Sequence, residues 1–368
     1  MELLREGYHE RLFLLTDERE GLIVRKQAKA ASSTLVAEIA WLEELPPSLH
    51  RYFPRVLRSS KANGNGQALF YDMPYFGHEW VLLSELILTQ ALYRPQALAL
   101  ISQVMQVMFG DIFPTTYSEE EPHYLERLVR LLERSTQHIS QIPSFSPFIH
   151  TEALVLNGEQ MCNVFPLLET CKSEQFLRQR LRPAVIRKVH GDLYPENVLV
   201  HTPSIQQSAP RVMLLDPIAA LGLSRGDFAM DAAKFTSWLS AELLALRLGL
   251  FSLQEERGAL PAFTLTFHTG HTRLRALRNG VLLREFLAML ETAGWARSVC
   301  DADPRWRQRV SFYEALYALS MVPLVPFPQS LARFLVGVRH LHNFVFASDD
   351  QQAAQTLAAR ALRVETYN

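Results

Sequence analysis

Alternating apolar and polar positions make the first part of the chain strand-rich. Strands are predicted at residues 3–8 (LLREGY), 11–16 (RLFLLT), 22–27 (LIVRKQ), 55–60 (RVLRSS) and 67–76 (QALFYDMPYF). DEREG at residues 17–21 is a turn, and the last two strands are expected to pair as a hairpin around the flexible KANGNG segment at residues 61–66. One helix interrupts the series at residues 32–46, where Leu35, Ile39 and Leu42 fall on one stripe and Pro46 stops the helix.

Helical spacing dominates after residue 77. Apolar residues recur every three or four positions at residues 94–113, 122–139 and from 227 onward. Short strands are expected on both sides of residues 190–197, at 211–216 and at 261–267, where phenylalanine and leucine alternate with threonine. With 368 residues the chain exceeds one ordinary core. We therefore predict an α+β protein with a small lobe at residues 1–77 and a larger helical lobe at residues 78–368.

Composition narrows the class of protein without identifying it. Apolar residues make up 48% of the chain and charged residues 20%, which is ordinary for a globular protein. The net charge of −1 favours neither nucleic acid nor an anionic membrane surface as a partner, and no apolar run is long enough to span a membrane. Three cysteines without metal-ligand spacing, and no secretory pattern at the N-terminus, lead us to expect a cytoplasmic protein.

One short polar loop carries the candidate chemistry. His190, Asp192 and Asn197 lie between two apolar segments, and Pro195 excludes a regular helix through them. Asp216 ends the next predicted strand. One carboxylate and one amide oxygen from neighbouring strand ends suit Mg²⁺, which needs few protein ligands when phosphates supply the rest. The second carboxylate could then face a substrate hydroxyl. The alternative is a capped turn with two unrelated acids.

These residues carry a resemblance to a known family. The spacing H-x-D-x-x-x-x-N, followed by a strand that ends in aspartate, resembles the catalytic and metal loops of protein-kinase-like enzymes. With His-Gly-Asp at residues 190–192 and Gly-Asp-x-x-x-Asp at residues 226–231, the chain is similar to the aminoglycoside phosphotransferase and choline kinase branch. The resemblance covers most of the chain. It implies a two-lobed protein-kinase-like fold, with an antiparallel sheet and one helix in the small lobe.

The resemblance also implies roles for the loop residues and for two bound groups, ATP and Mg²⁺. Asp192 would orient the acceptor hydroxyl and take its proton, while His190 would stabilise the catalytic loop. Asn197 and Asp216 would hold Mg²⁺ against the phosphates.

A lysine on the third strand, held by a helix glutamate, is the family's contact to the α- and β-phosphates. Lys26 and Glu38 stand at these places. A period of two puts Val24 and Lys26 on one face, with Val24 toward adenine, and Arg25 on the other face. The alternative is that Lys26 is a solvated surface charge, and Lys29 is a weaker substitute because it falls beyond the predicted strand.

The remaining nucleotide contacts are less marked in the sequence. Protein kinases have three glycines in the loop that covers the phosphates, whereas this chain offers only Gly7 there. Backbone groups near Met73 and Tyr75 would bind the adenine edge, although an ordinary buried strand would have the same sequence.

Together these features predict an ATP- and Mg²⁺-dependent phosphotransferase whose partner is a small-molecule alcohol: an aminoglycoside, an amino alcohol, a sugar or a natural product. A protein kinase is disfavoured, because no Ala-Pro-Glu segment or long activation loop separates Asp216 from the next helix. Two further functions compete with phosphotransfer, those of a catalytically silent nucleotide-binding protein and of a nucleotidyl transferase.

Several polar residues outside the loop receive structural interpretations. Asp227 is predicted to cap the following helix, and by the resemblance Asp231 would tie the catalytic loop. His268 and His271 have H-x-x-H spacing but no third ligand nearby, which argues against a metal site. The acceptor is expected to contact residues 94–142 or 240–283.

Overall fold

The chain forms two compact units in the computed structural model, which describes residues 1–6, 10–61, 68–113, 123–218, 221–303 and 305–363. The first unit comprises Met1–Thr116 and Lys188–Gly226, and the second comprises Tyr117–Arg187 and Asp227–Asn368. The predicted division after residue 77 differs from this partition, because the segment with the predicted catalytic loop belongs to the first unit together with the N-terminal strands.

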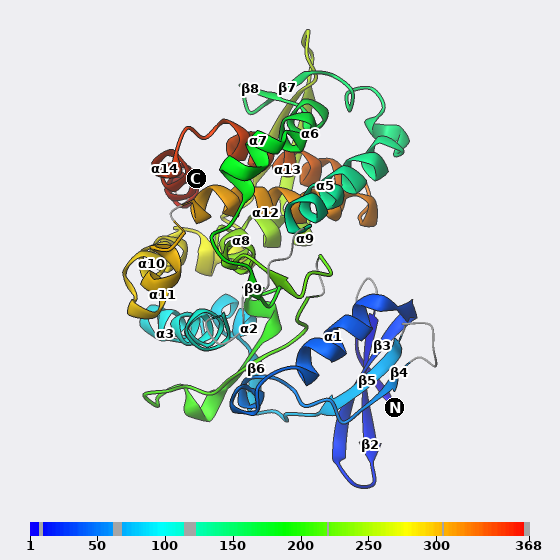
Figure 1. Ribbon diagram of the computed structural model, residues 1–368, viewed down its shortest axis with the longest axis vertical. Coiled ribbons are helices and arrows are strands. Elements are labelled where there is room, and N and C mark those ends of the chain that lie inside the picture. The colour runs from blue at the N-terminus through cyan, green and yellow to red at the C-terminus, as the bar shows by residue number, and fades with distance from the viewer. Residues whose placement is uncertain (7–9, 62–67, 114–122, 219–220, 304, 364–368) are drawn as a thin grey trace. The chain divides into compact units, whose positions relative to one another are not determined.

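A five-stranded antiparallel sheet forms the N-terminal part of the first unit (Figure 1). Its strands lie in the order β1-β2-β3-β5-β4, with β1 at Glu2–Glu6, β2 at Glu10–Asp17, β3 at Gly21–Ser32, β4 at Arg58–Lys61 and β5 at Ala68–Pro74. All the strands predicted in this part of the chain are confirmed, with ends shifted by a few residues. Leu12 lies opposite Lys26, and Lys26 lies opposite Tyr71, so these side chains share one face of the sheet.

Helix α1 (Ser33–Glu43) follows β3 directly and packs against β3 and β5 (Figure 1). The predicted stripe of Leu35, Ile39 and Leu42 is buried, so the apolar side of the helix faces the sheet as the pattern indicates. The helix ends ahead of the predicted stop at Pro46.

Two smaller sheets in the same unit hold the segment with the predicted catalytic loop. One has the order β11-β10-β6, and in the other β9 pairs with β12. Their bounds are Trp80–Leu82 for β6, Arg187–Lys188 for β9, Val198–His201 for β10, Val212–Leu214 for β11 and Arg225–Gly226 for β12.

Two of these strands are shorter than predicted, and each has a physical reason. The strand expected from residue 184 begins only at Arg187, since the Ala184 N–H donates to the Asp303 carboxylate at 2.9 Å instead of joining a ladder. The strand expected to end in Asp216 stops at Leu214, because Asp216 has a φ of +56°, outside the range of a β-strand.

Helices complete the first unit. They are η1 at Pro47–Tyr52, α2 at Leu83–Leu88, α3 at Arg94–Met105, η2 at Gln106–Ile112, η5 at Pro195–Asn197 and η6 at Thr202–Ser204. The helix predicted at residues 94–113 is confirmed, although its second half (η2) has π-helical rather than α-helical hydrogen bonding.

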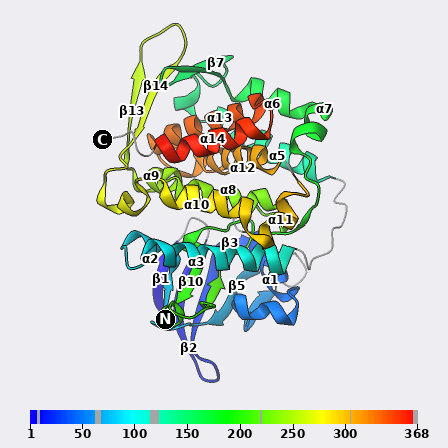
Figure 2. The same ribbon diagram turned by 90° about the vertical axis from the view of Figure 1, so that its left-hand side faces the viewer.

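The second unit is mainly helical, which with the sheets of the first unit confirms the predicted α+β class (Figure 2). Its longer helices are α5 at Tyr124–Ser140, α6 at Val164–Lys172, α8 at Phe228–Leu239, α10 at Val281–Thr292, α12 at Trp306–Ser320, α13 at Gln329–Phe346 and α14 at Asp350–Arg363. Shorter ones are η3 at Pro143–Phe145, α7 at Glu174–Phe176, η4 at Leu177–Leu181, α9 at Glu242–Leu248, η7 at Thr272–Leu277, α11 at Gly294–Cys300 and η8 at Val322–Leu324.

A four-stranded sheet in the second unit was only partly predicted. Its order is β13-β14-β7-β8, with β7 at Ala153–Leu156, β8 at Glu159–Cys162, β13 at Phe251–Glu256 and β14 at Ala262–Phe267 (Figure 2). Strand β14 is confirmed, whereas β7, β8 and β13 were missed. The first two have four residues each, too few to show a period, and β13 ends in exposed polar residues that give it no apolar pattern.

Buried charge as well as apolar packing holds the second unit together. Asp227 caps α8 as predicted, its side chain accepting a hydrogen bond from the Ala229 N–H at 3.0 Å. The guanidinium of Arg309, fully buried in α12, also binds the carboxylates of Asp227 and Asp303. This clamp anchors the start of α8 to α12. Within the described parts of the chain, no helix is both long and apolar enough to cross a membrane.

The contact between α12 and α13 depends on one glycine. A Cβ atom added at Gly337 would lie 2.7 Å from Cγ of the buried Leu319. We expect Gly337→Ala to lower the free energy of unfolding by about 1–3 kcal/mol, because the extra methyl group overpacks this contact. Gly294→Ala is the matched control, since nothing lies within 4 Å of its added Cβ. Urea unfolding of both variants tests this, and equal stabilities would contradict it.

Candidate active site

The backbone of the predicted catalytic loop is fixed to the segment that leads to Asp216. The Asn197 N–H donates to the Tyr194 carbonyl at 2.8 Å, which forms the 3₁₀ turn η5. The Asn197 carbonyl accepts from the Leu215 N–H, also at 2.8 Å. Asn197 and Asp216 are therefore held on adjacent backbone segments, and their shared binding of a metal ion stays a prediction.

Asp192 and Asn197 are in direct contact. The side-chain nitrogen of Asn197 donates to the Asp192 carbonyl at 2.9 Å and to the Asp192 carboxylate at 3.3 Å. Both residues are buried. Because the nitrogen donates to Asp192, the oxygen is the atom through which Asn197 can bind a metal ion.

Gly191 cannot be another residue without a change in the loop. Its φ is +79°, and an added Cβ would lie 3.1 Å from the Leu223 carbonyl oxygen and 3.2 Å from Cα of Ile218. The preceding carbonyl, that of His190, accepts a hydrogen bond of 2.5 Å from the Ile218 N–H. The glycine of the His-Gly-Asp sequence thus allows the catalytic loop to approach the segment after Asp216.

That segment is strained. Asp216 has a φ of +56° and Ile218 a φ of +59°. The left-handed region is unfavourable for a β-branched residue such as Ile218, and this kind of strain gathers at functional sites. Ile218 is fully buried and its N–H binds His190, so packing and hydrogen bonding keep it in this conformation.

Lys26 joins this segment to the sheet and to α1. Its ammonium lies 2.8 Å from both carboxylate oxygens of Glu38 and 3.0 Å from Oδ1 of Asp216. The hydroxyl of Tyr71, on β5, donates to Glu38 at 2.9 Å. Lys26 and Glu38 are almost fully buried, so the alternative of a solvated surface lysine is wrong.

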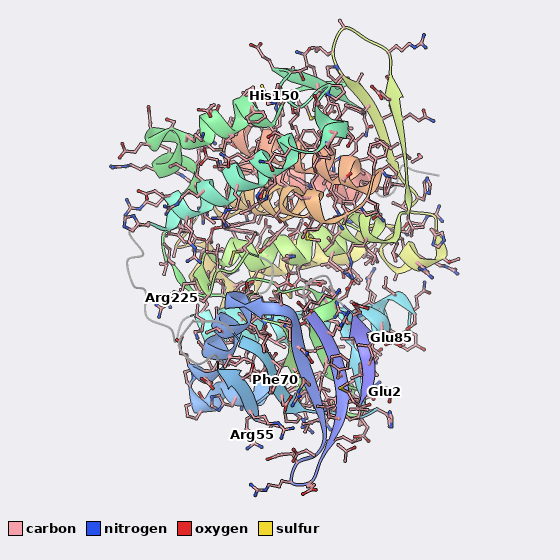
Figure 3. All side chains as sticks on the ribbon, turned by 90° about the vertical axis from the view of Figure 1, so that its right-hand side faces the viewer. Glu2, Arg55, Phe70, Glu85, His150 and Arg225 are labelled. Atoms are coloured by element: carbon pink, nitrogen blue, oxygen red, sulfur yellow. The ribbon has the colours of Figure 1, made fainter. Side chains whose placement is uncertain are left out.

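The strand register is the one predicted by a period of two. Arg25 points to the opposite face of the sheet from Lys26, where its guanidinium donates two hydrogen bonds to Asp72, at 2.8 and 3.0 Å. It also lies over the ring of Phe70, which is labelled in Figure 3, at 3.9 Å from the ring centroid. The basic neighbour of Lys26 therefore has a structural role.

Three charges in this cluster determine its electrostatics. Burial opposes a charge on Lys26, but the carboxylates of Asp216 and Glu38 hold the pKa of its ammonium well above the usual value. Burial would likewise raise the pKa of Asp216, and the charge and hydrogen bond of Lys26 reverse this and lower it. For the second carboxylate burial prevails and raises the pKa of Glu38 to about 7. Two carboxylates thus share one ammonium, and Asp216 is the one whose charged form is favoured.

A charged carboxylate that a bound group can reach suits a divalent cation. The side chain of Asp216 is 15% exposed, against 2% for Glu38, so Asp216 is the carboxylate that a bound group can reach. Among the residues that the structure describes, no group of three or more His, Cys, Asp or Glu could hold a metal ion by itself. Mg²⁺ bound by Asp216, Asn197 and phosphate oxygens requires no such group.

His190 is enclosed behind the loop. It is fully buried, with the rings of Trp41 and Phe53 each 6.4 Å from its own, and its Nδ1 accepts a hydrogen bond from the Asp192 N–H at 3.3 Å. Burial lowers the pKa of His190 to about 4. A neutral imidazole that accepts from the loop backbone fits the expected stabilising role rather than proton transfer.

The other predicted nucleotide contacts are Met73 and Tyr75, at the end of β5, and Gly7. Met73 is buried opposite Val24, and the Tyr75 N–H donates to the Leu22 carbonyl at 3.2 Å. The backbone of β5 is therefore partly engaged with β3 at this point. Gly7 lies outside the described residues.

Sequence reasoning missed three residues that support the site. Tyr71 binds Glu38, and the indole of Trp41 donates to the Val189 carbonyl at 3.0 Å. Lys188 donates to the Trp41 carbonyl and to Glu44, each at 3.1 Å. Tyr71 could have been found by pairing the predicted strands, since it lies opposite Lys26. Trp41 and Lys188 give no such signal, because their contacts join segments distant in the chain.

Some predicted residues lie in the second unit. Asp231 is fully buried in α8, and its predicted tie to the catalytic loop stays a prediction. The ring of His271 accepts a hydrogen bond from the Arg273 N–H at 3.2 Å and caps η7, which is a structural role. Residues 240–269 contribute to a cavity of about 390 Å³ that also contacts α13 and α14.

Comparison with known proteins gives distant similarities. No protein-family model matches the chain, and no curated protein matches it. Among solved structures, choline kinase from Cryptosporidium parvum is 12% identical (TM-score 0.47; 100% of this chain, 92% of that chain). Plasmodium vivax ethanolamine kinase is 9% identical (TM-score 0.49; 95% and 84%). A Ralstonia eutropha protein described provisionally as an aminoglycoside phosphotransferase is 14% identical (TM-score 0.47; 96% and 92%). Similarities this distant identify neither a substrate nor a reaction.

The buried neutral state of His190 makes stability depend on pH. The pKa is about 4 in the folded protein and 6.5 in the unfolded chain, so the unfolded chain binds more protons between these values. This contribution is complete above pH 6.5 and is lost as the pH falls toward 4, by about 3 kcal/mol at most. We expect His190→Gln to weaken the pH dependence of the unfolding free energy by up to this amount. The exposed His78→Gln is the control, and an unchanged dependence in His190→Gln would contradict the prediction.

Proposed function

We propose that this chain is an ATP- and Mg²⁺-dependent phosphotransferase of the aminoglycoside phosphotransferase and choline kinase type, which phosphorylates a hydroxyl group of a small molecule. The observation that carries the proposal is the position of the Lys26 ammonium, 2.8 Å from Glu38 and 3.0 Å from Asp216. A buried lysine paired with a helix glutamate, next to a carboxylate that could hold Mg²⁺, supports the proposal, because protein kinases hold the nucleotide phosphates with such groups. Such an enzyme works where ATP is available, in keeping with the expected cytoplasmic location.

In this proposal Lys26 binds the α- and β-phosphates and Glu38 orients it, with Tyr71 fixing Glu38 in turn. Asp216 and Asn197 supply the oxygens for Mg²⁺. When bound, the ion neutralises charge on the transferring phosphoryl group. Phosphoryl transfer has a loose transition state, so placement of these groups accounts for most of the rate enhancement.

Asp192 acts on the acceptor. Its carboxylate orients the hydroxyl and accepts its proton, and the side-chain nitrogen of Asn197 holds the carboxylate in place at 3.3 Å. His190 positions the loop by accepting from the Asp192 N–H. Neither role requires His190 to change protonation state.

The adenine ring would lie on the sheet face that carries Val24, next to the end of β5. Since the Tyr75 N–H already donates to Leu22, the carbonyl groups of this segment are the better partners for the adenine edge. Met73 then contributes mainly its buried side chain. The role expected of Gly7 remains part of the proposal.

Two substitutions separate the metal and acceptor roles. We expect Asp216→Ala to reduce ADP release by at least ~100-fold, because a carboxylate that holds Mg²⁺ at the phosphates is lost. Asp192→Asn should keep ATP binding yet reduce phosphorylation by ~100-fold or more, since the proton has no carboxylate to receive it. A coupled assay of ADP release over a panel of small alcohols tests both. Full Mg²⁺-dependent activity in either variant would refute the corresponding role.

The neighbouring basic residues give a matched pair. Lys26→Met should lower kcat/KM for ATP by ~10–100-fold, the usual loss when a charged hydrogen bond to phosphate is removed. Arg25→Met should leave this ratio nearly unchanged and lower only stability, since Arg25 binds Asp72 on the other face. The reverse pattern in steady-state kinetics would contradict the assignment of Lys26.

The same assays separate the competing functions. A catalytically silent nucleotide-binding protein would bind ATP and release no ADP with any acceptor. Nucleotidyl transfer would release pyrophosphate and add a nucleotide to the product. A protein kinase would phosphorylate a protein substrate and none of the alcohols.

A further inference from the structure

Arg5 lies on the same face of the five-stranded sheet as Lys26. In the strand register Arg5 is opposite Leu12, and Leu12 is opposite Lys26. Directly opposite residues of antiparallel strands point to the same face, so the three side chains form one row across β1, β2 and β3. With strands about 4.8 Å apart, Arg5 begins about 10 Å from Lys26 on the face that carries Glu38 and Asp216.

The arginines of β2 and β3 point the opposite way and have anionic partners. Arg11 precedes Leu12 on β2, so it faces away from Lys26, and it binds Glu6 at 3.1 Å. Arg25 on β3 binds Asp72 at 2.8 Å. For Arg5, by contrast, no hydrogen bond or ion pair is found with any residue in the described part of the chain. Its side chain is exposed.

The charge of Arg5 nevertheless acts on the site. It is one of the groups that lower the pKa of Asp216, after Lys26, which requires the guanidinium to lie within electrostatic range of that carboxylate. Another charge of the same hairpin, Glu10 at the start of β2, acts on Lys26. The β1–β2 hairpin therefore contributes charge to the same space as Lys26 and Asp216.

We propose that Arg5 binds the terminal phosphate of the nucleotide, so that Lys26 and Arg5 hold the triphosphate from two positions in one row of the sheet. This inference rests on the proposed function. A guanidinium offers several N–H donors in a planar fork that matches phosphate oxygens, and it stays charged at any physiological pH. It supplies by a side chain what a loop with three glycines supplies by backbone N–H groups, and this sequence has one glycine in that loop.

The assignment predicts a change in nucleotide preference. Removing Arg5 should weaken ATP binding by ~10–100-fold, the loss typical of a charged hydrogen bond. ADP lacks the terminal phosphate, so its affinity should change by less than ~3-fold. The ratio of the two affinities is thus the quantity that identifies the phosphate concerned.

Isothermal titration of the full-length protein with MgATP and MgADP tests the inference on Arg5→Gln, Arg5→Lys and Arg11→Gln. We expect Arg5→Gln to lose most of the preference for ATP, Arg5→Lys to retain part of it, and Arg11→Gln to match the wild type. Thermal unfolding of each variant shows whether the sheet remains folded. If Arg5→Gln is unfolded, Arg5→Lys, which keeps the charge but not the fork, still tests the preference.

A failure of the proposed function and a failure of the inference about Arg5 give different results in these titrations. A wild type that binds neither nucleotide refutes the proposed function itself. A wild type that binds ATP while Arg5→Gln binds both nucleotides like Arg11→Gln refutes the role of Arg5 alone. Equal weakening of ATP and ADP in Arg5→Gln also refutes it, because Arg5 would then act on a phosphate that both nucleotides share.

Discussion

The first unit is organised around a buried ammonium that faces two carboxylates. Lys26 comes from a strand, Glu38 from the following helix and Asp216 from a loop almost two hundred residues later, and their contacts of 2.8 to 3.0 Å fix these elements to one another. Loss of one partner of a buried ion pair costs roughly 3–5 kcal/mol, because the remaining charge is left uncompensated. Lys26 is that partner for Glu38 and for Asp216 at once.

This constraint explains the unusual backbone of the loops. To bring its carboxylate to Lys26 the chain leaves the strand at Leu214 and enters the left-handed region at Asp216. The hydrogen bond from Ile218 to His190 keeps it there, and that approach is possible only because Gly191 has no side chain. The strain at Ile218 and the requirement for glycine are thus two parts of one arrangement, which links the position of Asp216 to that of the predicted catalytic loop.

Much of the first unit's fold and of the candidate site could be predicted from the sequence, because the patterns that indicate them lie within short segments of the chain. Alternation in LIVRKQ predicts that Arg25 and Lys26 point to opposite faces of the sheet, and the spacing of His190, Asp192 and Asn197 predicts the polar loop. The orientation of Arg5 depends on a bulge between Leu3 and Arg5, which shifts the side chains that follow to the other face and which no pattern of apolar residues reveals. Trp41 and Lys188 lie far apart in the chain, so the hydrogen bond between them depends on tertiary packing alone. The short strands β7 and β8 were missed for another reason, because four residues are too few to show an alternating pattern.

The contact between Asn197 and Asp192 bears on how the protein ages. Deamidation would convert the Asn197 side chain to a carboxylate, so the donor at 2.9 Å from the Asp192 carbonyl would become a charged acceptor beside a second carboxylate. Two like charges at this distance favour protonation of one of them. Because the site is buried, water could not screen that repulsion. Under the proposed function, a change of one amide to a carboxylate at Asn197 would therefore disturb the carboxylate assigned to the acceptor while hardly altering the size of the side chain.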